Sequence, residues 1–185
     1  LSAVGLGVLV TTLVAYFYTK NTVESLAQGQ ITQALNYLDR ETDLQARDMA
    51  IQTSLVAQEV VLRLALDNSY LGLSARAAAQ RKLEIYVRSG AFDRVYLMDP
   101  QGRLVMASDP SLPGKLEISD RRYFTQALSG HPALETIPVS RANGRPIMVS
   151  STPLRGPDGR ILGVVVGRIH TETFAREMLN DSRIG

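Results

Sequence analysis

Two different hydrophobic periodicities divide the chain near Gly90. Between Lys20 and about Asp67 the chain contains no proline, and apolar residues recur at intervals of 7, 4, 7 and 4. These apolar positions are Leu44, Ile51, Leu55, Leu62 and Leu66. The spacing predicts one long helix with a continuous apolar seam. The seam either packs on the chain's own domain or also packs on a second copy, because a seam does not reveal its partner.

A second helix and a set of strands are predicted to follow. The helix is expected from about Ser74 to Arg88, with Ser74 as its N-cap and Gly90 beyond its end. After Gly90, five apolar runs are separated by turn sequences such as Asp-Pro, Asn-Gly and Asp-Gly. The runs cover residues 94–98, 103–108, 134–139, 146–153 and 160–170. They predict an α+β fold, with a five-stranded antiparallel sheet and helices on one face.

The first 18 residues form a separate apolar segment. Leu1 to Tyr18 contain no charged residue, and Lys20 follows soon after an aromatic group that includes Tyr16 and Phe17. A bilayer requires roughly 20 apolar residues in a helix, and no small-residue cleavage site typical of a signal peptide follows. We therefore expect residues 1–18 to be a transmembrane signal anchor, with the remainder of the chain outside the cytoplasm.

Composition excludes several functional classes. The net charge is +2, and the Lys and Arg residues do not gather in one stretch, which argues against a nucleic-acid-binding face. The chain has no cysteine and only two histidines, so a zinc site lacks ligands. No nucleophilic triad, phosphate-binding loop or pair of catalytic acids is recognisable. We expect no enzyme activity, no metal and no cofactor.

Three sequence stretches resemble a Cache domain, the PAS-like extracytoplasmic sensor of bacterial chemoreceptors, histidine kinases and diguanylate cyclases. They are "SDRRYFTQALSG", the turn "SRANGRP" and the strand "GVVVGRI". The resemblance covers Thr19 to about Asp181 and implies the membrane-distal module of a double Cache sensor, with a long leading helix. Residues 182–185 resemble the start of a linker to a membrane-proximal module. A parallel homodimer, which would pass a signal to paired output domains, is the corresponding expectation.

Arg168 is the main candidate for ligand binding. Alternation along residues 160–170 predicts that Arg168 shares one face with Val164, Val166 and His170. An arginine on an apolar face is costly to bury unless it meets an anion. That anion is either a ligand or an internal partner such as Glu135 or Asp120, and exposure at the strand's end is a further alternative.

The resemblance to Cache domains refines this hypothesis. Sensors of amino acids in this family carry an Arg-x-Trp-Tyr stretch and an aspartate on the last strand, which pairs with the ligand's amine. Here Arg121, Tyr123 and Phe124 fall on the first pattern with both aromatic positions changed, and Arg168 replaces the aspartate. C4-dicarboxylate sensors of the family are more similar, having Arg-x-Tyr-Phe and a basic residue on the last strand. The resemblance thus implies that Arg121 and Arg168 bind a small carboxylate.

The remaining candidates are weaker. Ser140 and Thr152 could donate hydrogen bonds into a pocket, although such residues beside hairpins are more often turn caps. Tyr96 could line the pocket or fill the core. The sequence favours a ligand-sensing module, and the alternative is a PAS-like dimerisation or partner-binding module without a small-molecule ligand.

Overall fold

The computed structural model describes residues 33, 36–37, 39–67, 69–112, 116–137 and 144–171. The chain divides into two compact units, Leu1–Gln45 and Ala46–Gly185, and the described residues of the first unit are helical. The transmembrane segment expected at residues 1–18 lies outside the described residues. Within the described part, no helix is both long enough and apolar enough to cross a bilayer.

The predicted long helix is interrupted at Glu59. Residues 39–58 are helical and α2 spans Val60–Ala65, but Glu59 between them has an extended backbone with φ −64° and ψ 116°. Its carboxylate accepts hydrogen bonds from Lys82 Nζ at 2.9 Å and from the Tyr86 hydroxyl at 3.0 Å. The prediction of an unbroken helix was therefore wrong at this residue, where contacts with the next helix accompany a break that contains no proline.

Helix α3 begins earlier than predicted. It spans Tyr70–Arg88, and its N-cap is Ser69, whose hydroxyl accepts a hydrogen bond from the Gly72 backbone N–H at 3.2 Å. Ser74 lies inside the helix, and its hydroxyl donates to the Tyr70 carbonyl at 2.8 Å. The N-cap is therefore Ser69, and the prediction of Ser74 was wrong.

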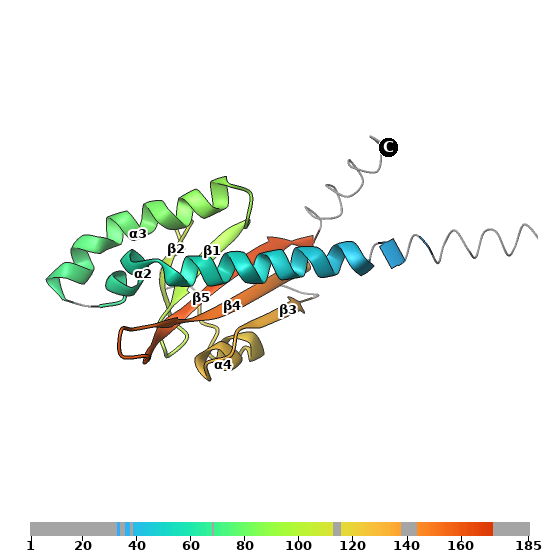
Figure 1. Cartoon of the computed structure of the whole chain (residues 1–185). Coiled ribbons are helices and arrows are strands. Elements are labelled where there is room, and N and C mark those ends of the chain that lie inside the picture. The colour runs from blue at the N-terminus through green and yellow to red at the C-terminus, as the bar shows by residue number, and fades with distance from the viewer. Residues whose placement is uncertain are drawn as a thin grey trace, which may run out of the picture. The chain divides into compact units, whose positions relative to one another are not determined.

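The predicted sheet is confirmed. Its five antiparallel strands have the order β2-β1-β5-β4-β3. The strands are β1 (Arg94–Met98), β2 (Leu104–Ala107), β3 (Ala133–Ile137), β4 (Ile147–Arg155) and β5 (Ile161–His170). The last strand in the chain, β5, lies at the centre of the sheet (Figure 1), and its residues 163–168 are buried.

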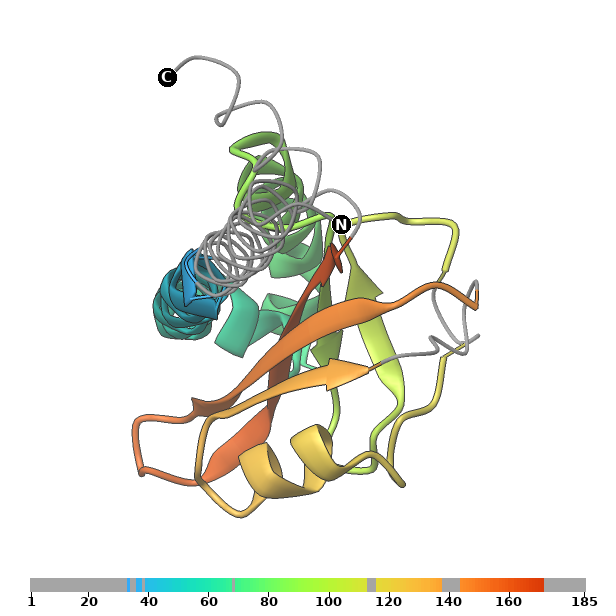
Figure 2. The same cartoon turned by 90° about the vertical axis from the view of Figure 1, so that its right-hand side faces the viewer.

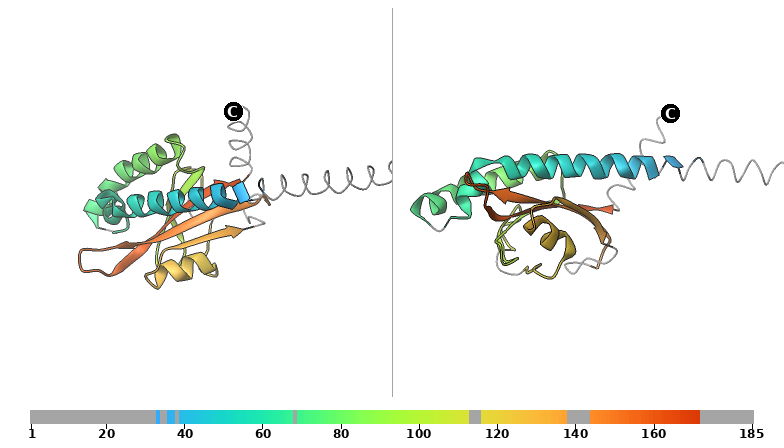
Figure 3. Two further views of the ribbon diagram at one scale, coloured as in Figure 1. Left: turned by 45° about the vertical axis from the view of Figure 1, so that its right-hand side comes forward. Right: turned by 60° about the horizontal axis from the view of Figure 1, so that its bottom comes forward.

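Each face of the sheet has its own hydrophobic core. Val165 of β5 packs with residues of the helices that precede the sheet, whereas Val164 and Val166 pack with helix α4 (Arg122–Leu128). This alternation along β5 is as predicted. The placement of all helices on one face was wrong, because α4 covers the face opposite to α3 (Figures 2 and 3). Tyr123, Phe124 and Ala127 form the buried side of α4.

A glycine allows β5 to approach the segment before β1. A Cβ atom on Gly167 would lie 2.3 Å from Cε1 of Phe92, which is closer than any non-bonded contact allows. Phe92 is itself buried in the core on the helical face. Gly167 therefore fixes how β5 packs on that face, while its neighbour Arg168 points to the other one.

Candidate functional site

The α4 face of the sheet contains a cavity with a largely apolar wall and two arginines. Its empty space, including the open mouth and the solvent there, measures about 530 Å³. The lining residues are Tyr96, Leu116, Glu117, Ile118, Arg121, Tyr123, Ile137, Ile147, Val149, Val166 and Arg168. They come from β1, β3, β4, β5, the start of α4 and the loop before it. Residues far apart in the sequence therefore form one concave site.

Arg168 places a buried positive charge in this cavity. Its side chain is buried, with the residue only 6% exposed. Nη2 lies 3.3 Å from Nε2 of His170, and Nε is buried without a hydrogen-bond partner. Among the residues that the structure describes, no carboxylate forms an ion pair with Arg168, and neither Glu135 nor Asp120 serves as the internal partner considered from the sequence. A buried guanidinium in this state is unfavourable until an anion reaches it.

The Tyr96 ring offers Arg168 a partial substitute for an anion. The Arg168 Cζ atom lies 6.0 Å from the centroid of that ring, at the limit of a cation–π contact. Burial raises the pKa of the Tyr96 phenol, and the charge of Arg168 partly opposes that rise. The phenol thus stays neutral at physiological pH and can donate a hydrogen bond within the cavity.

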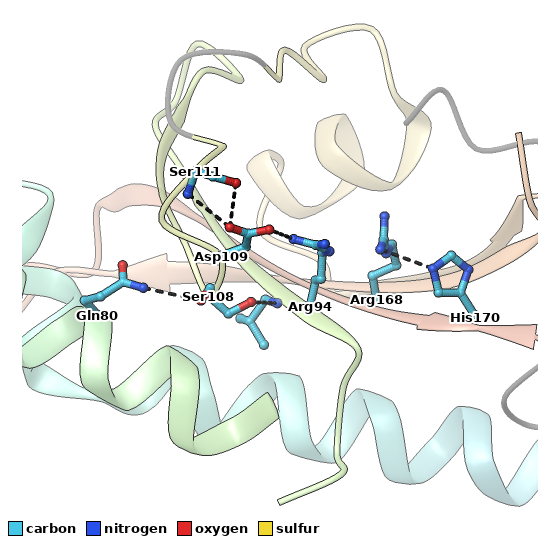
Figure 4. A network of polar contacts seen from close by, with 8 residues as sticks. Gln80, Arg94, Ser108, Asp109, Ser111, Arg168 and His170 are labelled. Atoms are coloured by element: carbon cyan, nitrogen blue, oxygen red, sulfur yellow. Dashed lines mark hydrogen bonds and ion pairs between the residues drawn. The ribbon is translucent and has the colours of Figure 1, made fainter. Parts of the chain in front are cut away.

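A second arginine on the same face is already neutralised. Arg94 of β1 is the cross-strand partner of Arg168, and its guanidinium donates to the carboxylate of Asp109. This hydrogen bond from Arg94, helped by Ser111, holds the pKa of Asp109 well below its usual range. Figure 4 shows Arg94 engaged with Asp109, whereas Arg168 beside it reaches only His170. Asp109 is therefore paired with Arg94 and does not neutralise Arg168.

Arg121 and Tyr123 lie at the start of α4. Arg121 is the N-cap residue and makes no side-chain capping bond, and its side chain lines the cavity. The Tyr123 backbone is held by the buried Ser151 hydroxyl, which donates to its carbonyl at 2.8 Å. Burial raises the pKa of Tyr123 to about 12, with the charge of Arg121 partly opposing this. The site thus presents a cation and a neutral phenol beside each other.

The structure brings together four of the seven predicted site residues. Arg121, Tyr123, Arg168 and Tyr96 all line the cavity. Phe124 is buried in the core beneath α4 and does not line it. Thr152 pairs with Val165 and lines a separate groove that includes Ser54 and Arg63 of the helical face. Ser140 lies outside the described residues.

Sequence reasoning missed most of the apolar wall and the Arg94–Asp109 pair. Val149 lies directly opposite Arg168 on β4, and Ile147 lies opposite His170. Alternation assigns such residues to a face only when the register between strands is known, and that register is not visible in the sequence. In the described part of the chain, no cluster of His, Asp and Glu could hold a metal ion.

Comparison with known proteins identifies the fold of this site. The sequence model of a family described as Cache domain matches residues 19–185. The V. cholerae histidine kinase DctB sensor domain is 21% identical, with a TM-score of 0.64, over 77% of this chain and 57% of that chain. The E. coli DcuS sensor domain is 14% identical, with a TM-score of 0.56, over 73% of this chain and 98% of that one.

A chemoreceptor domain is also similar. The ligand-binding domain of the Pseudomonas fluorescens chemoreceptor CtaA, in complex with L-leucine, is 23% identical, with a TM-score of 0.52, over 75% of this chain and 59% of that chain. The chain thus spans just over half the length of the DctB and CtaA domains. No curated protein sequence matches this chain.

The pKa of Tyr123 predicts a specific alkaline loss of stability. A phenol with a folded pKa of about 12 is neutral in the folded chain while the unfolded chain ionises near pH 10. Its contribution is complete below pH 10 and is lost as the pH rises toward 12, at up to about 1.4 kcal/mol per pH unit. We expect Tyr123→Phe to flatten the pH dependence of the free energy of unfolding, measured in urea between pH 9 and 11.5. Tyr70→Phe, at an exposed tyrosine, is the control, and equal slopes in both variants would contradict the assignment.

Proposed function

This chain belongs to the Cache domain family, whose members are sensory and non-catalytic modules, and on that premise we propose that it is a periplasmic sensor of a small organic acid. The single observation that carries the ligand class is Arg168. A buried guanidinium without a carboxylate partner lines an apolar cavity, and a carboxylate is the anion that guanidinium groups bind in bidentate geometry.

The balance of charge in the cavity favours an acid without an amine. Arg121 and Arg168 line it from different elements, and the one carboxylate among its lining residues is Glu117, which is exposed. An ammonium group in the interior would therefore have no buried acid to pair with, and it would add to the charge of Arg168. A C4-dicarboxylate, with one carboxylate at each arginine, is the ligand we propose.

The alternative is a Cache module that binds no small molecule and acts only through protein contacts. Two features of the cavity oppose it. A site kept only for packing would be filled with side chains, and a buried arginine in its wall would be matched by an acid, as Arg94 is matched by Asp109. The two functions are separated by measuring whether a small organic acid raises the melting temperature of the chain.

We expect succinate or malate to raise the melting temperature of the purified chain. A ligand at 100 times its Kd stabilises by about 2.7 kcal/mol, which corresponds to roughly 5–10 °C for a protein of this size. Arg168→Ala should abolish the shift, because it removes the buried cation that the ligand pairs with. Differential scanning fluorimetry against a panel of organic acids measures both effects.

A matched control is the neighbouring Arg122→Ala. Arg122 is exposed and does not line the cavity, so this variant should respond to the acid like the unmodified chain. If Arg168→Ala lowers the melting temperature but leaves the response to every acid intact, Arg168 has an internal structural role and the dicarboxylate proposal is wrong.

We propose further that the sensor module is anchored in the inner membrane by residues 1–18 and continues from residue 19 to about residue 181 in the periplasm. The uncharged apolar run at residues 1–18 supports this topology. Alkaline phosphatase fused after Gly185 should be active in a Gram-negative host. Active cytoplasmic β-galactosidase at the same fusion site, with inactive phosphatase, would reverse the topology.

A parallel homodimer through the leading helix is the proposed assembly. Leu62 of the predicted seam is fully buried within its own chain, but Ile51 and Leu55 are 59% and 46% exposed. One part of the seam therefore packs inside the chain, whereas Ile51 and Leu55 form an exposed apolar strip that a second copy could cover.

Cysteine placed singly at Ile51 or Leu55 should crosslink two subunits in membranes, whereas cysteine at the exposed Tyr70 should not. Equal yields at all three positions would contradict a dimer through this strip.

A further inference from the structure

We propose that a groove between the helical layer and β4, on the face of the sheet opposite to the cavity, binds a small tetrahedral oxyanion, phosphate or sulfate. The groove is lined by Ser54, Ala57, Gln58, Arg63, Thr152, Pro153 and Arg155. The sequence singled out Thr152 as a ligand-binding residue, and the structure places it here. The inference does not depend on the proposed function, because the groove and the Arg168 cavity share no lining residue.

The Thr152 hydroxyl is a buried polar group at this groove. The residue is only 6% exposed, and its Oγ1 is buried without a hydrogen-bond partner. Alternation along β4 turns Thr152 away from α4, since the preceding Ser151 donates to the Tyr123 carbonyl on that face. A buried hydroxyl in this state is unfavourable, and a hydrogen-bond acceptor in the groove would relieve it. Thr152 therefore favours a ligand that carries acceptor atoms.

The helix break at Glu59 positions Arg63 at the groove. In an unbroken helix the Leu62 backbone N–H would donate to the Gln58 carbonyl, but here it donates to the Glu59 carbonyl at 3.1 Å. The Gln58 carbonyl accepts instead from Arg63 Nη2 at 2.8 Å. Nε of Arg63 remains buried and without a hydrogen-bond partner. A carbonyl thus positions the guanidinium, which keeps donors for an anion.

The groove has positive charge that no acid offsets. None of its lining residues is Asp or Glu. Arg155 donates from Nη1 to the Gly159 carbonyl and from Nη2 to the Gly130 carbonyl, each at 3.1 Å. Within the part of the chain that the structure describes, neither Arg63 nor Arg155 forms an ion pair. Two guanidinium groups with uncompensated charge favour an anion over a neutral ligand.

The placement of the donors favours a tetrahedral oxyanion over a carboxylate. Ser54 and Arg63 come from the helical layer, whereas Thr152 comes from the sheet. A carboxylate has two oxygens in one plane, which suit the parallel N–H groups of a single guanidinium. Phosphate and sulfate present acceptor oxygens in several directions. One such anion can therefore accept from both layers at once, and its binding would join the helical layer to β4.

Phosphate and sulfate are the probes, added separately to the purified full chain in a chloride buffer of matched ionic strength. We expect the melting temperature to rise by roughly 3–6 °C for an anion at about ten times its Kd, measured by differential scanning fluorimetry. The anion that gives the larger shift at equal concentration is the preferred ligand. If neither anion raises the melting temperature above its value in chloride, the proposal is wrong.

Thr152→Val should produce two effects of opposite sign. It removes the unpartnered hydroxyl and keeps the branched shape of the side chain, so the melting temperature without anion should rise. The affinity for phosphate or sulfate, taken from the concentration dependence of the shift, should fall by roughly tenfold or more. Thr152→Ser keeps the hydroxyl and should keep the response. A purely structural role for Thr152 would not combine higher stability with weaker anion binding.

Arg63→Met tests the charge, and Arg88→Met is the matched control. Each variant loses one positive charge, but Arg88 is exposed and paired with Glu84 outside the groove. Arg63→Met should lose the response to phosphate and sulfate, whereas Arg88→Met should keep it. If Thr152→Val and Arg63→Met respond to both anions as Arg88→Met does, the groove does not bind them and the proposal is overturned.

Arg168→Ala separates this site from the cavity. This variant should keep its response to phosphate and sulfate, and Arg63→Met should keep the response of the unmodified chain to succinate. Loss of the phosphate and sulfate response in Arg168→Ala would assign these anions to the cavity and contradict a site at the groove. Failure of succinate to bind any variant would overturn the dicarboxylate proposal alone.

Discussion

Burial of the Arg168 guanidinium without an acid beside it is the constraint on which the site depends. Desolvating a cation costs several kcal/mol unless an opposite charge compensates it. The described residues provide only an imidazole nitrogen and the face of a tyrosine ring at the limit of contact. The sheet that surrounds Arg168 must therefore be stable enough to tolerate this cost in the empty state. Binding of an anion would then recover it.

The fold supplies that stability through two hydrophobic cores, one on each face of the sheet. The helical face of the sheet has a core of its own, in which Val165 and Phe92 are buried. The α4 face has a second core around Phe124, next to the cavity. Because β5 is central and contributes to both, Arg168 is held by a strand paired on each side, with Arg94 of β1 and Val149 of β4 as its neighbours.

The sequence predicted the strands better than it predicted the course of the helices around the sheet. Apolar runs bounded by Asn-Gly and Asp-Gly turns are local signals, and all five strands form where they were expected. The break at Glu59 and the face chosen by α4 depend on contacts between distant segments, such as that of Glu59 with Lys82, and no local pattern encodes them. Within the site, Arg121, Tyr123 and Arg168 were identifiable because a charge or a family motif singles them out. Thr152 was wrongly predicted to line the pocket because the register between strands was not known. Its neighbour Ser151 is the residue of β4 that contacts α4.

The alternation of β5 has a consequence for how such a sensor can diversify. Arg168 belongs to the cavity, whereas Gly167 belongs to the contact with Phe92 on the opposite face. A residue that lines the cavity and a residue that contacts the segment before β1 therefore occupy adjacent positions of one strand. Substitutions at Val166 or Arg168, which line the cavity, would change what the cavity recognises and leave the contact of Gly167 with Phe92 intact. New chemical specificities could arise on this scaffold by exchanging single side chains, without rebuilding the surface that faces the helices.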